Sequence, residues 1–201
     1  MADNVFQDVK STESSQLRLG FLTAIHVDRR GYVAGLLVTN RYGRPLEFQC
    51  TTPVKPNRTQ ELLYGPTLVP FILGELIGHT LVDKIGVKPH LILTDRNEML
   101  ELRNHISIPV ACLNATRATP HTEQPSCNPS TPPIDLQNES LSTTEVSLGR
   151  RVFRIHSAHA TDLGVLRHNA AAISPDADLQ EPLQRVVNAL NETMSVKLGA
   201  V

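Results

Sequence analysis

The chain has 201 residues, of which 40% are hydrophobic and 4% aromatic, and its formal net charge is -1 at pH 7. This length and composition suffice for one ordinary buried core, built mainly from aliphatic side chains. A near-neutral chain has no overall field that attracts nucleic acid or an anionic membrane, so a polyanionic partner would need a local basic patch.

Residues 1–16, MADNVFQDVKSTESSQ, contain acidic residues and no apolar stretch of signal-peptide length. We expect this terminus to be disordered and the protein to be cytoplasmic. The most apolar segment, LVPFILGELIGHTLV, is interrupted by Gly74, Glu75, Gly78 and His79. It is shorter than the roughly 18 apolar residues of a membrane span. We therefore expect no membrane partner.

Residues 17–115 have the sequence patterns of an α/β domain. Three β-prone runs, at 19–27, 32–39 and 46–51, are separated by the turn sequences DRRG and NRYGRP, which predicts a three-stranded antiparallel meander. Apolar positions recur at helical spacing over residues 67–85. HLILT and IPVAC then predict two further buried strands, with a short helix between them. This alternation favours at least one parallel crossover.

The composition changes over residues 116–148, which are rich in proline, serine, threonine and asparagine. Such a segment has little to bury and predicts a flexible linker. Residues 149–201 follow with one predicted strand, a short helix and an amphipathic helix whose apolar positions run from Leu183 to Met194. Because this segment is too small for an independent core, we expect it to dock on the α/β domain.

Three antiparallel strands, a helix, and then an apolar strand that ends in an acid follow one another within residues 19–112. This order resembles the opening of the ribonuclease H-like fold. Nucleases of that fold hold divalent metal with carboxylates from the first strand, the first helix and the fourth strand. The resemblance places Asp28, Glu75 (or Glu61) and Asp95 at those positions. Such carboxylates could bind Mg²⁺ or Mn²⁺ for phosphodiester hydrolysis.

Each of these acids also has an ordinary structural explanation. Asp28 lies in DRRG, a common turn composition, and the first acid of that fold usually lies further inside its strand. Asp95 could cap the helix that follows it, and Glu75 could face water. We favour these explanations.

Histidines and cysteines provide weaker candidates. His156, His159 and Asp162 are spaced for one face of a helix and could bind a transition metal. A strand at this segment would split them between two faces, and we favour surface histidines. Cys50 and Cys112 lie in apolar runs, where burial would raise the thiol pKa and leave the thiols inert.

The segment from Thr52 to Tyr64 joins the predicted meander to the long helix. Pro53 and Pro56 restrict its backbone, so it should hold one shape at little cost in entropy. Four of its side chains could then meet a protein partner: Lys55, Arg58, Gln60 and Tyr64. The segment also resembles uncharacterised bacterial proteins, a resemblance that implies no activity.

Basic residues recur in or beside the predicted turns: Arg29, Arg30, Arg41, Arg44, Lys55 and Arg58. Several of them could gather at one rim and contact phosphate groups of a nucleic acid, although a solvated loop surface is the simpler explanation. The sequence therefore favours a soluble binding or regulatory protein. A metal-dependent phosphodiesterase or nuclease is the alternative, and the oligomeric state stays open.

Overall fold

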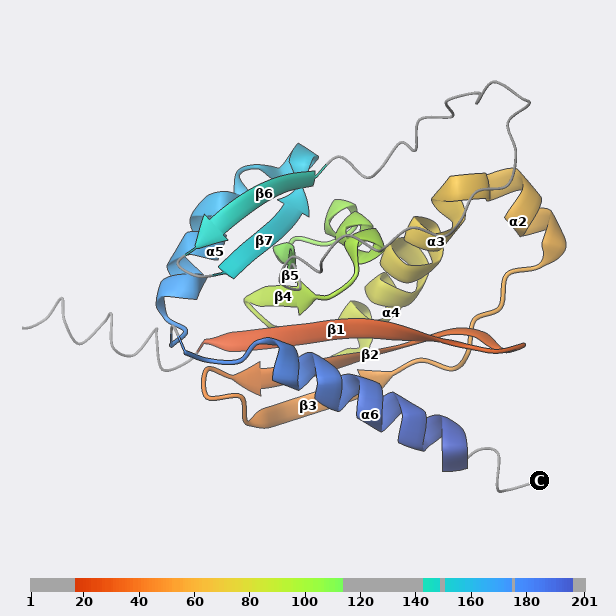
Figure 1. Cartoon of the computed structure of the whole chain (residues 1–201), viewed down its shortest axis with the longest axis horizontal. Helices are drawn as coiled ribbons and strands as arrows, with labels where there is room; N and C mark the ends of the chain where they lie inside the picture. Colours follow the sequence, from red (N-terminus) through yellow and green to blue (C-terminus); the bar gives the residue numbers. More distant parts are fainter. Residues whose placement is uncertain (1–16, 114–142, 149–150, 175, 197–201) are drawn as a thin grey trace, which may run out of the picture.

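The computed structural model describes residues 17–113, 143–148, 151–174 and 176–196 (Figure 1). The strands are β1 (Arg18–Val27), β2 (Gly31–Asn40), β3 (Pro45–Cys50), β4 (Leu91–Thr94), β5 (Val110–Leu113), β6 (Thr143–Leu148) and β7 (Arg151–His156). The α-helices are α2 (Arg58–Tyr64), α3 (Leu68–Pro70), α4 (His79–Lys84), α5 (Asp162–Ala171) and α6 (Gln180–Val196). The remaining helical elements are the 3₁₀ helices η1 (Gly65–Thr67), η3 (Asn97–Asn104) and η4 (Ser157–His159) and the π-helical η2 (Phe71–Gly78).

The strands form one seven-stranded sheet in the order β3-β2-β1-β4-β5-β7-β6. β1 pairs antiparallel with β2, and β2 with β3, whereas β4 runs parallel to β1 and β5 parallel to β4. The predicted α/β fold, a meander followed by a helix and two buried strands, is confirmed. This order agrees with the ribonuclease H-like resemblance drawn from the sequence.

The central strands are buried on both faces, because successive side chains of a strand point to opposite sides of the sheet. Leu19 and Phe21 of β1 enter one core cluster, and Leu22 and Ala24 enter the other. This explains why β1, β4 and β5 are near-continuous apolar runs without a polar alternation.

One face of the sheet is covered by the helical run of α3, η2 and α4, which buries Ile72, Leu73, Ile77 and Leu81. Gly74 lets η2 approach η3 closely, because a Cβ atom there would lie 2.8 Å from the Cβ atom of Glu101. By length and composition alone, residues Arg58–Lys84 could cross a membrane, and 44% of the apolar window is buried inside the structure. A core helix passes the same test, so this run is weak evidence for a membrane span.

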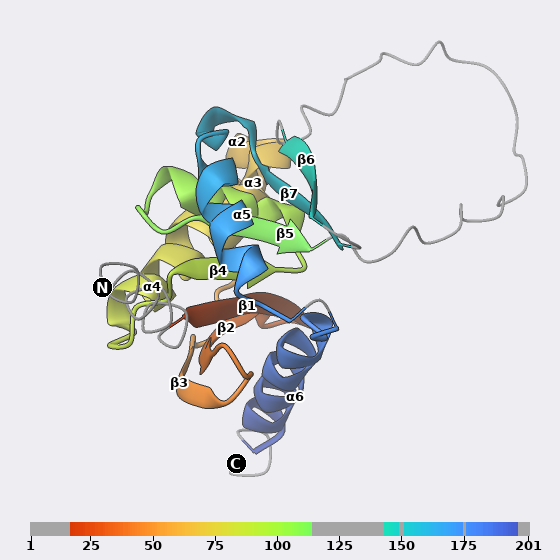
Figure 2. The same ribbon diagram turned by 90° about the vertical axis from the view of Figure 1, so that its left-hand side faces the viewer.

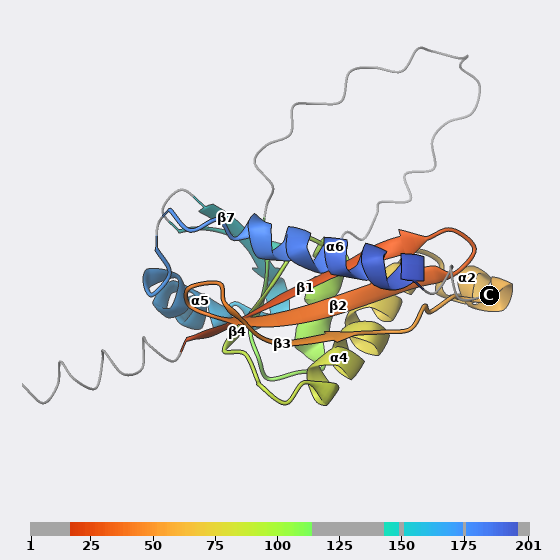
Figure 3. The same ribbon diagram turned by 90° about the horizontal axis from the view of Figure 1, so that it is seen from below.

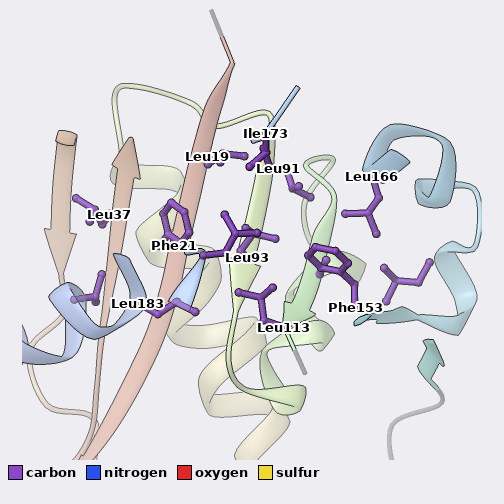
Figure 4. Packing of buried hydrophobic residues seen from close by; sticks show 14 of the residues in the cluster. Leu19, Phe21, Leu37, Leu91, Leu93, Leu113, Phe153, Leu166, Ile173 and Leu183 are labelled. Atoms are coloured by element: carbon purple, nitrogen blue, oxygen red, sulfur yellow. The ribbon is translucent and has the colours of Figure 1, made fainter. Parts of the chain in front are cut away.

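The opposite face of the sheet is covered by α6, which runs along β1 and β2 (Figures 2 and 3). Its apolar stripe is buried in the first core cluster, together with side chains of β1, β4, β5, β7 and α5 (Figure 4). The stripe consists of Leu183, Val186, Leu190 and Met194.

The C-terminal segment extends the same sheet. β7 pairs antiparallel with β5, and β6 pairs with β7. The linker prediction extends too far, since residues 143–148 form β6; residues 116–142 lie outside the described residues, as does the predicted disordered terminus 1–16. Arg103 of η3 holds Asp162 of α5 through two hydrogen bonds of 2.6 and 3.1 Å, with both side chains largely buried.

Candidate functional site

A crevice for a ligand is expected where the chain leaves neighbouring parallel strands in opposite directions, outside their carboxyl ends. β1 and β4 are such a pair, because β1 leads to β2 on one side and β4 leads to β5 on the other. Asp95 follows β4 directly and is exposed. Thr23 of β1 lies beside it, and Thr23 Oγ1 donates a hydrogen bond of 2.7 Å to Asp95 Oδ1.

Asp28 lies far from this crevice. Val27 ends β1 and pairs with Gly31, so Asp28 begins the exposed turn of the β1–β2 hairpin. It comes five positions after Thr23, which corresponds to roughly 16 Å along an extended strand.

The two candidate helix acids also lie elsewhere. Oε2 of Glu75, on η2, lies 3.8 Å from Nε2 of His105. His105 follows the C-terminal end of η3, whereas Asp95 precedes its N-terminal end, so Glu75 and Asp95 lie at opposite ends of η3. Glu61 of α2 pairs with Arg58 at 3.1 Å. Within the part of the chain that the structure describes, no three His, Cys, Asp or Glu side chains are placed to hold a metal ion. Of the predicted carboxylates, the structure brings Asp95 alone to the crevice.

The ribonuclease H-like fold implies a divalent ion held by converging carboxylates, which can be compared with the residues of this crevice. Mg²⁺ and similar hard ions require negatively charged or carbonyl oxygen ligands. On the first strand, the residue next to Asp95 is Thr23, a neutral alcohol that is fully buried and donates to one of the Asp95 oxygens. These residues do not fit a carboxylate-held Mg²⁺ or Mn²⁺ ion. In the sequence, Thr23 could have been noticed as a polar residue inside the apolar strand LGFLTAIHV.

The histidines near η4 do not form the predicted group with Asp162. His156 and His159 have their ring centroids 5.7 Å apart, and Nε2 of His159 lies 2.8 Å from Oδ1 of Asn104. Asp162 instead accepts both of its hydrogen bonds from Arg103, so it has a structural role.

A cluster of histidines and acids that the sequence did not indicate lies beside them. Glu101 of η3 has one carboxylate oxygen 3.9 Å from Nε2 of His105 and the other 3.9 Å from Nε2 of His156. Glu101 and His105 are four positions apart at the end of η3, whereas His156 comes from β7, far away in the sequence. The spacing of Glu101 and His105 is visible in the sequence, but their approach to His156 is not.

The proline loop is fastened to the β1–β2 turn. Tyr32 and Val54 exchange two backbone hydrogen bonds of 2.8 Å. Gly31 has a φ of +88°, and a Cβ atom there would lie 2.2 Å from the carbonyl oxygen of Val54 and 2.7 Å from Cα of Lys55. Glycine is required at this position, and the contact brings Lys55 next to the hairpin turn.

Gln60, one of the predicted contact residues, is part of a helix cap. The side chain of Asn57 accepts a hydrogen bond of 2.8 Å from the backbone N–H of Gln60, and Oε1 of Gln60 accepts one of 2.9 Å from the N–H of Asn57. This capping box starts α2, a helix with no buried residue.

The other predicted contact residues point outward or lie on the surface. The side chain of Arg58 is 79% exposed. The ring of Tyr64 is stacked on Phe71 with centroids 4.7 Å apart and leaves 38% of the residue exposed. Lys55 is exposed as well.

The six basic residues do not share one rim but divide between the two ends of β2. Arg29 and Arg30 lie in the turn before β2, and Arg41 and Arg44 lie in the turn after it. The ten residues of β2 separate the two turns by roughly 30 Å. We call Arg29, Arg30 and Lys55, which the Gly31 contact brings together, the tip surface; the ribbon of α2, the helix that contains Arg58 and Tyr64, lies at the same end of the sheet (Figures 1 and 3).

Three of the cations at the far end of the hairpin contact other groups of the protein, whereas Arg44 is exposed and only its backbone takes part in hydrogen bonds within the described residues. Nε of Arg18 donates to the carbonyl oxygen of Lys88 at 2.8 Å, and Arg185 donates to that of Gly43 at 3.0 Å. Arg41 lies over the ring of Tyr42 at 4.8 Å.

On the tip surface, by contrast, three cationic side chains have no partner within the described residues. No hydrogen bond or ion pair joins the side chains of Arg29, Arg30 or Lys55 to another described group. Arg29 also has a φ of 64°, which holds its backbone in the tight turn. These side chains are therefore available to bind an external anion.

The thiols do not supply a nucleophile near Asp95. Burial, with a smaller effect from the Asp95 carboxylate, raises the pKa of Cys112 to about 12. Cys50 is exposed, so the expectation that it packs in an apolar environment is wrong: it lies on β3, an edge strand of the sheet.

No protein-family model and no curated protein matches this sequence. Among solved structures, endonuclease V from Bacillus subtilis is similar at 13% identity and a TM-score of 0.48, covering 98% of this chain and 93% of that chain. Human ENDOV is similar at 13% identity and a TM-score of 0.49, covering 92% and 87%. Ciona intestinalis endonuclease V in complex with an inosine-containing DNA is similar at 11% identity and a TM-score of 0.41, covering 96% and 99%. At these values the likenesses assign neither a family nor an activity.

Proposed function

We propose that this chain is a cytoplasmic nucleic-acid-binding protein that contacts phosphate groups through the tip surface. The carrying observation is that Arg29, Arg30 and Lys55 are brought together and have no partner among the described residues. Arginine and lysine side chains that are not already paired gain the most from phosphate, because binding releases counterions from the nucleic acid. The Tyr32–Val54 bridge holds the two segments in place before binding.

Aromatic rings at the same end support nucleic acid over an anionic membrane. Tyr64 of α2 is 38% exposed, and Tyr32 is half-buried with one side against the second core cluster; the third tyrosine, Tyr42, is exposed at the far end. Tyr32 also meets His26 edge to face, with ring centroids 5.0 Å apart. Proteins that bind single strands combine cations for the backbone with rings for base stacking.

Fluorescence anisotropy with labelled single-stranded DNA, single-stranded RNA and duplex DNA, about 20 nucleotides long, tests this proposal. We expect binding that weakens with salt. The double variant Arg29→Ala/Lys55→Ala should lower the affinity and reduce the salt slope by about 0.7 for each lost phosphate contact on a single strand.

The matched control is Arg41→Ala/Arg44→Ala, which removes the same charge from the far end of the hairpin and should leave the slope nearly unchanged. Failure of the wild type to bind any of the probes at low salt would contradict the proposal. Equal weakening in the two double variants would contradict it as well. Tight binding to anionic vesicles but not to nucleic acid would assign the surface to a membrane.

A metal-dependent phosphodiesterase or nuclease using Mg²⁺ or Mn²⁺ is the second candidate function, and it would need ion ligands other than Thr23 beside Asp95. The observation that favours it is the exposed Asp95 at the carboxyl end of β4. A cleavage assay with each ion and an Asp95→Asn control tests it. The protein partner expected at residues 52–64 stays a prediction.

A further inference from the structure

We infer that Thr23 replaces a metal-binding carboxylate in the crevice beside Asp95, so that the chain binds nucleic acid without a divalent ion at this place. Only the nucleic-acid part of this inference depends on the proposed function. The claim about the ion depends on Thr23 and Asp95 alone.

The pairing of β1 with β4 brings these two side chains together. Leu22 pairs with Thr94 in parallel register, so Thr23 and Asp95 are the next residues of the two strands. Their side-chain oxygens are 2.7 Å apart. Two carboxylates at that separation would repel each other unless a proton or a metal ion lay between them. A hydroxyl group needs neither, because the Thr23 hydroxyl is uncharged and donates a hydrogen bond to Asp95.

The buried polar atoms around Thr23 and Asp95 also have hydrogen-bond partners within the protein. Oγ1 of Thr94 accepts a hydrogen bond of 3.1 Å from the backbone N–H of Arg96 and donates to Sδ of Met99 at 3.2 Å. Thr23 and Thr94 are fully buried, and among the described residues no buried side-chain oxygen or nitrogen lacks a hydrogen-bond partner. The buried hydroxyl groups of Thr23 and Thr94 thus offer no unsatisfied oxygen to an ion.

This inference predicts a gain of metal binding from a single substitution. Thr23→Asp places a second carboxylate beside Asp95 and should bind Mn²⁺ at least about tenfold more tightly than the wild type. Without metal this variant should melt at a lower temperature, because two like charges meet at a buried position, and Mn²⁺ should restore much of the loss. Thr23→Ser keeps the hydrogen bond and should behave like the wild type.

Calorimetric and paramagnetic-resonance titrations with Mn²⁺, on the wild type and on Asp95→Asn, provide the decisive test and do not depend on Thr23→Asp folding. We expect the two proteins to bind Mn²⁺ equally weakly. One stoichiometric Mn²⁺ site in the wild type that Asp95→Asn abolishes would overturn the inference. A wild type that binds neither Mn²⁺ nor nucleic acid would overturn the proposed function and leave the inference about Thr23 intact.

Discussion

The two ends of the β1–β2 hairpin both carry cationic side chains, but they use them differently. At the far end, Arg18 and Arg185 donate to backbone carbonyl groups of neighbouring segments and so stabilise the fold. At the tip, Arg29 and Lys55 are brought close by a backbone contact and have no partner among the described residues. The number of basic residues does not distinguish the two ends, whereas their partners do in most cases: Arg44 is the exception at the far end, and Arg58, which pairs with Glu61, is the exception at the tip.

Replacing the glycine of each turn with alanine should give the largest difference between the two ends, measured as the loss in the free energy of unfolding. Gly31→Ala should lower the free energy of unfolding by about 2 to 4 kcal/mol, because the added Cβ atom would strike the Val54 carbonyl at a positive φ. Gly43 also has a positive φ, of 76°, but the nearest atom to an added Cβ is Nη2 of Arg185 at 3.5 Å, so Gly43→Ala should cost about 1 kcal/mol. Urea unfolding measures both, and equal losses would show that the Gly31 contact is not tight.

Two asparagines allow a finer test of the same comparison. Asn57 caps α2 at the tip, and Oδ1 of Asn40 accepts from the N–H groups of Tyr42 and Arg44 at the far end. Replacing either with alanine should cost about 1 kcal/mol of stability. Only Asn57→Ala should also weaken nucleic-acid binding, because it frees the helix start that positions Arg58. If Asn40→Ala weakened binding as much, the division between the two ends would be wrong.

The smallest expected effect is a pH dependence of the stability that the far end contributes through His90. Nδ1 of His90 accepts from the backbone N–H of Arg18 at 3.1 Å. Burial, helped by the charge of Arg18, lowers the pKa of His90 below its ordinary value of 6.5. The unfolded chain therefore takes up the proton at higher pH than the folded chain, and this contribution to stability is present above pH 6.5 and lost as the pH falls below it. Melting temperatures between pH 7.5 and 5 should fall less in His90→Asn than in the wild type, and parallel curves would contradict this.

Local patterns predicted most of the fold, because each strand of the meander and the long helix has its own apolar periodicity. The strand β6 was missed because TTEVSL is polar at most positions and becomes a strand through pairing with β7. The division of the basic residues between two ends could have been predicted from the sequence, because successive turns of a meander lie at opposite ends of the strand that joins them. The crevice could not be predicted, since neither Thr23 nor Asp95 reveals which residue it faces until the register of β1 and β4 is known.

The most direct test of the account is a map of where nucleic acid contacts the folded chain. Backbone amide NMR shifts of the wild type, titrated with a single-stranded oligonucleotide, should change over residues 28–31 and 54–64 and stay unchanged over residues 41–44. Changes centred on residues 41–44, or on Thr23 and Asp95 without the tip, would contradict the assignment of the tip surface as the binding end.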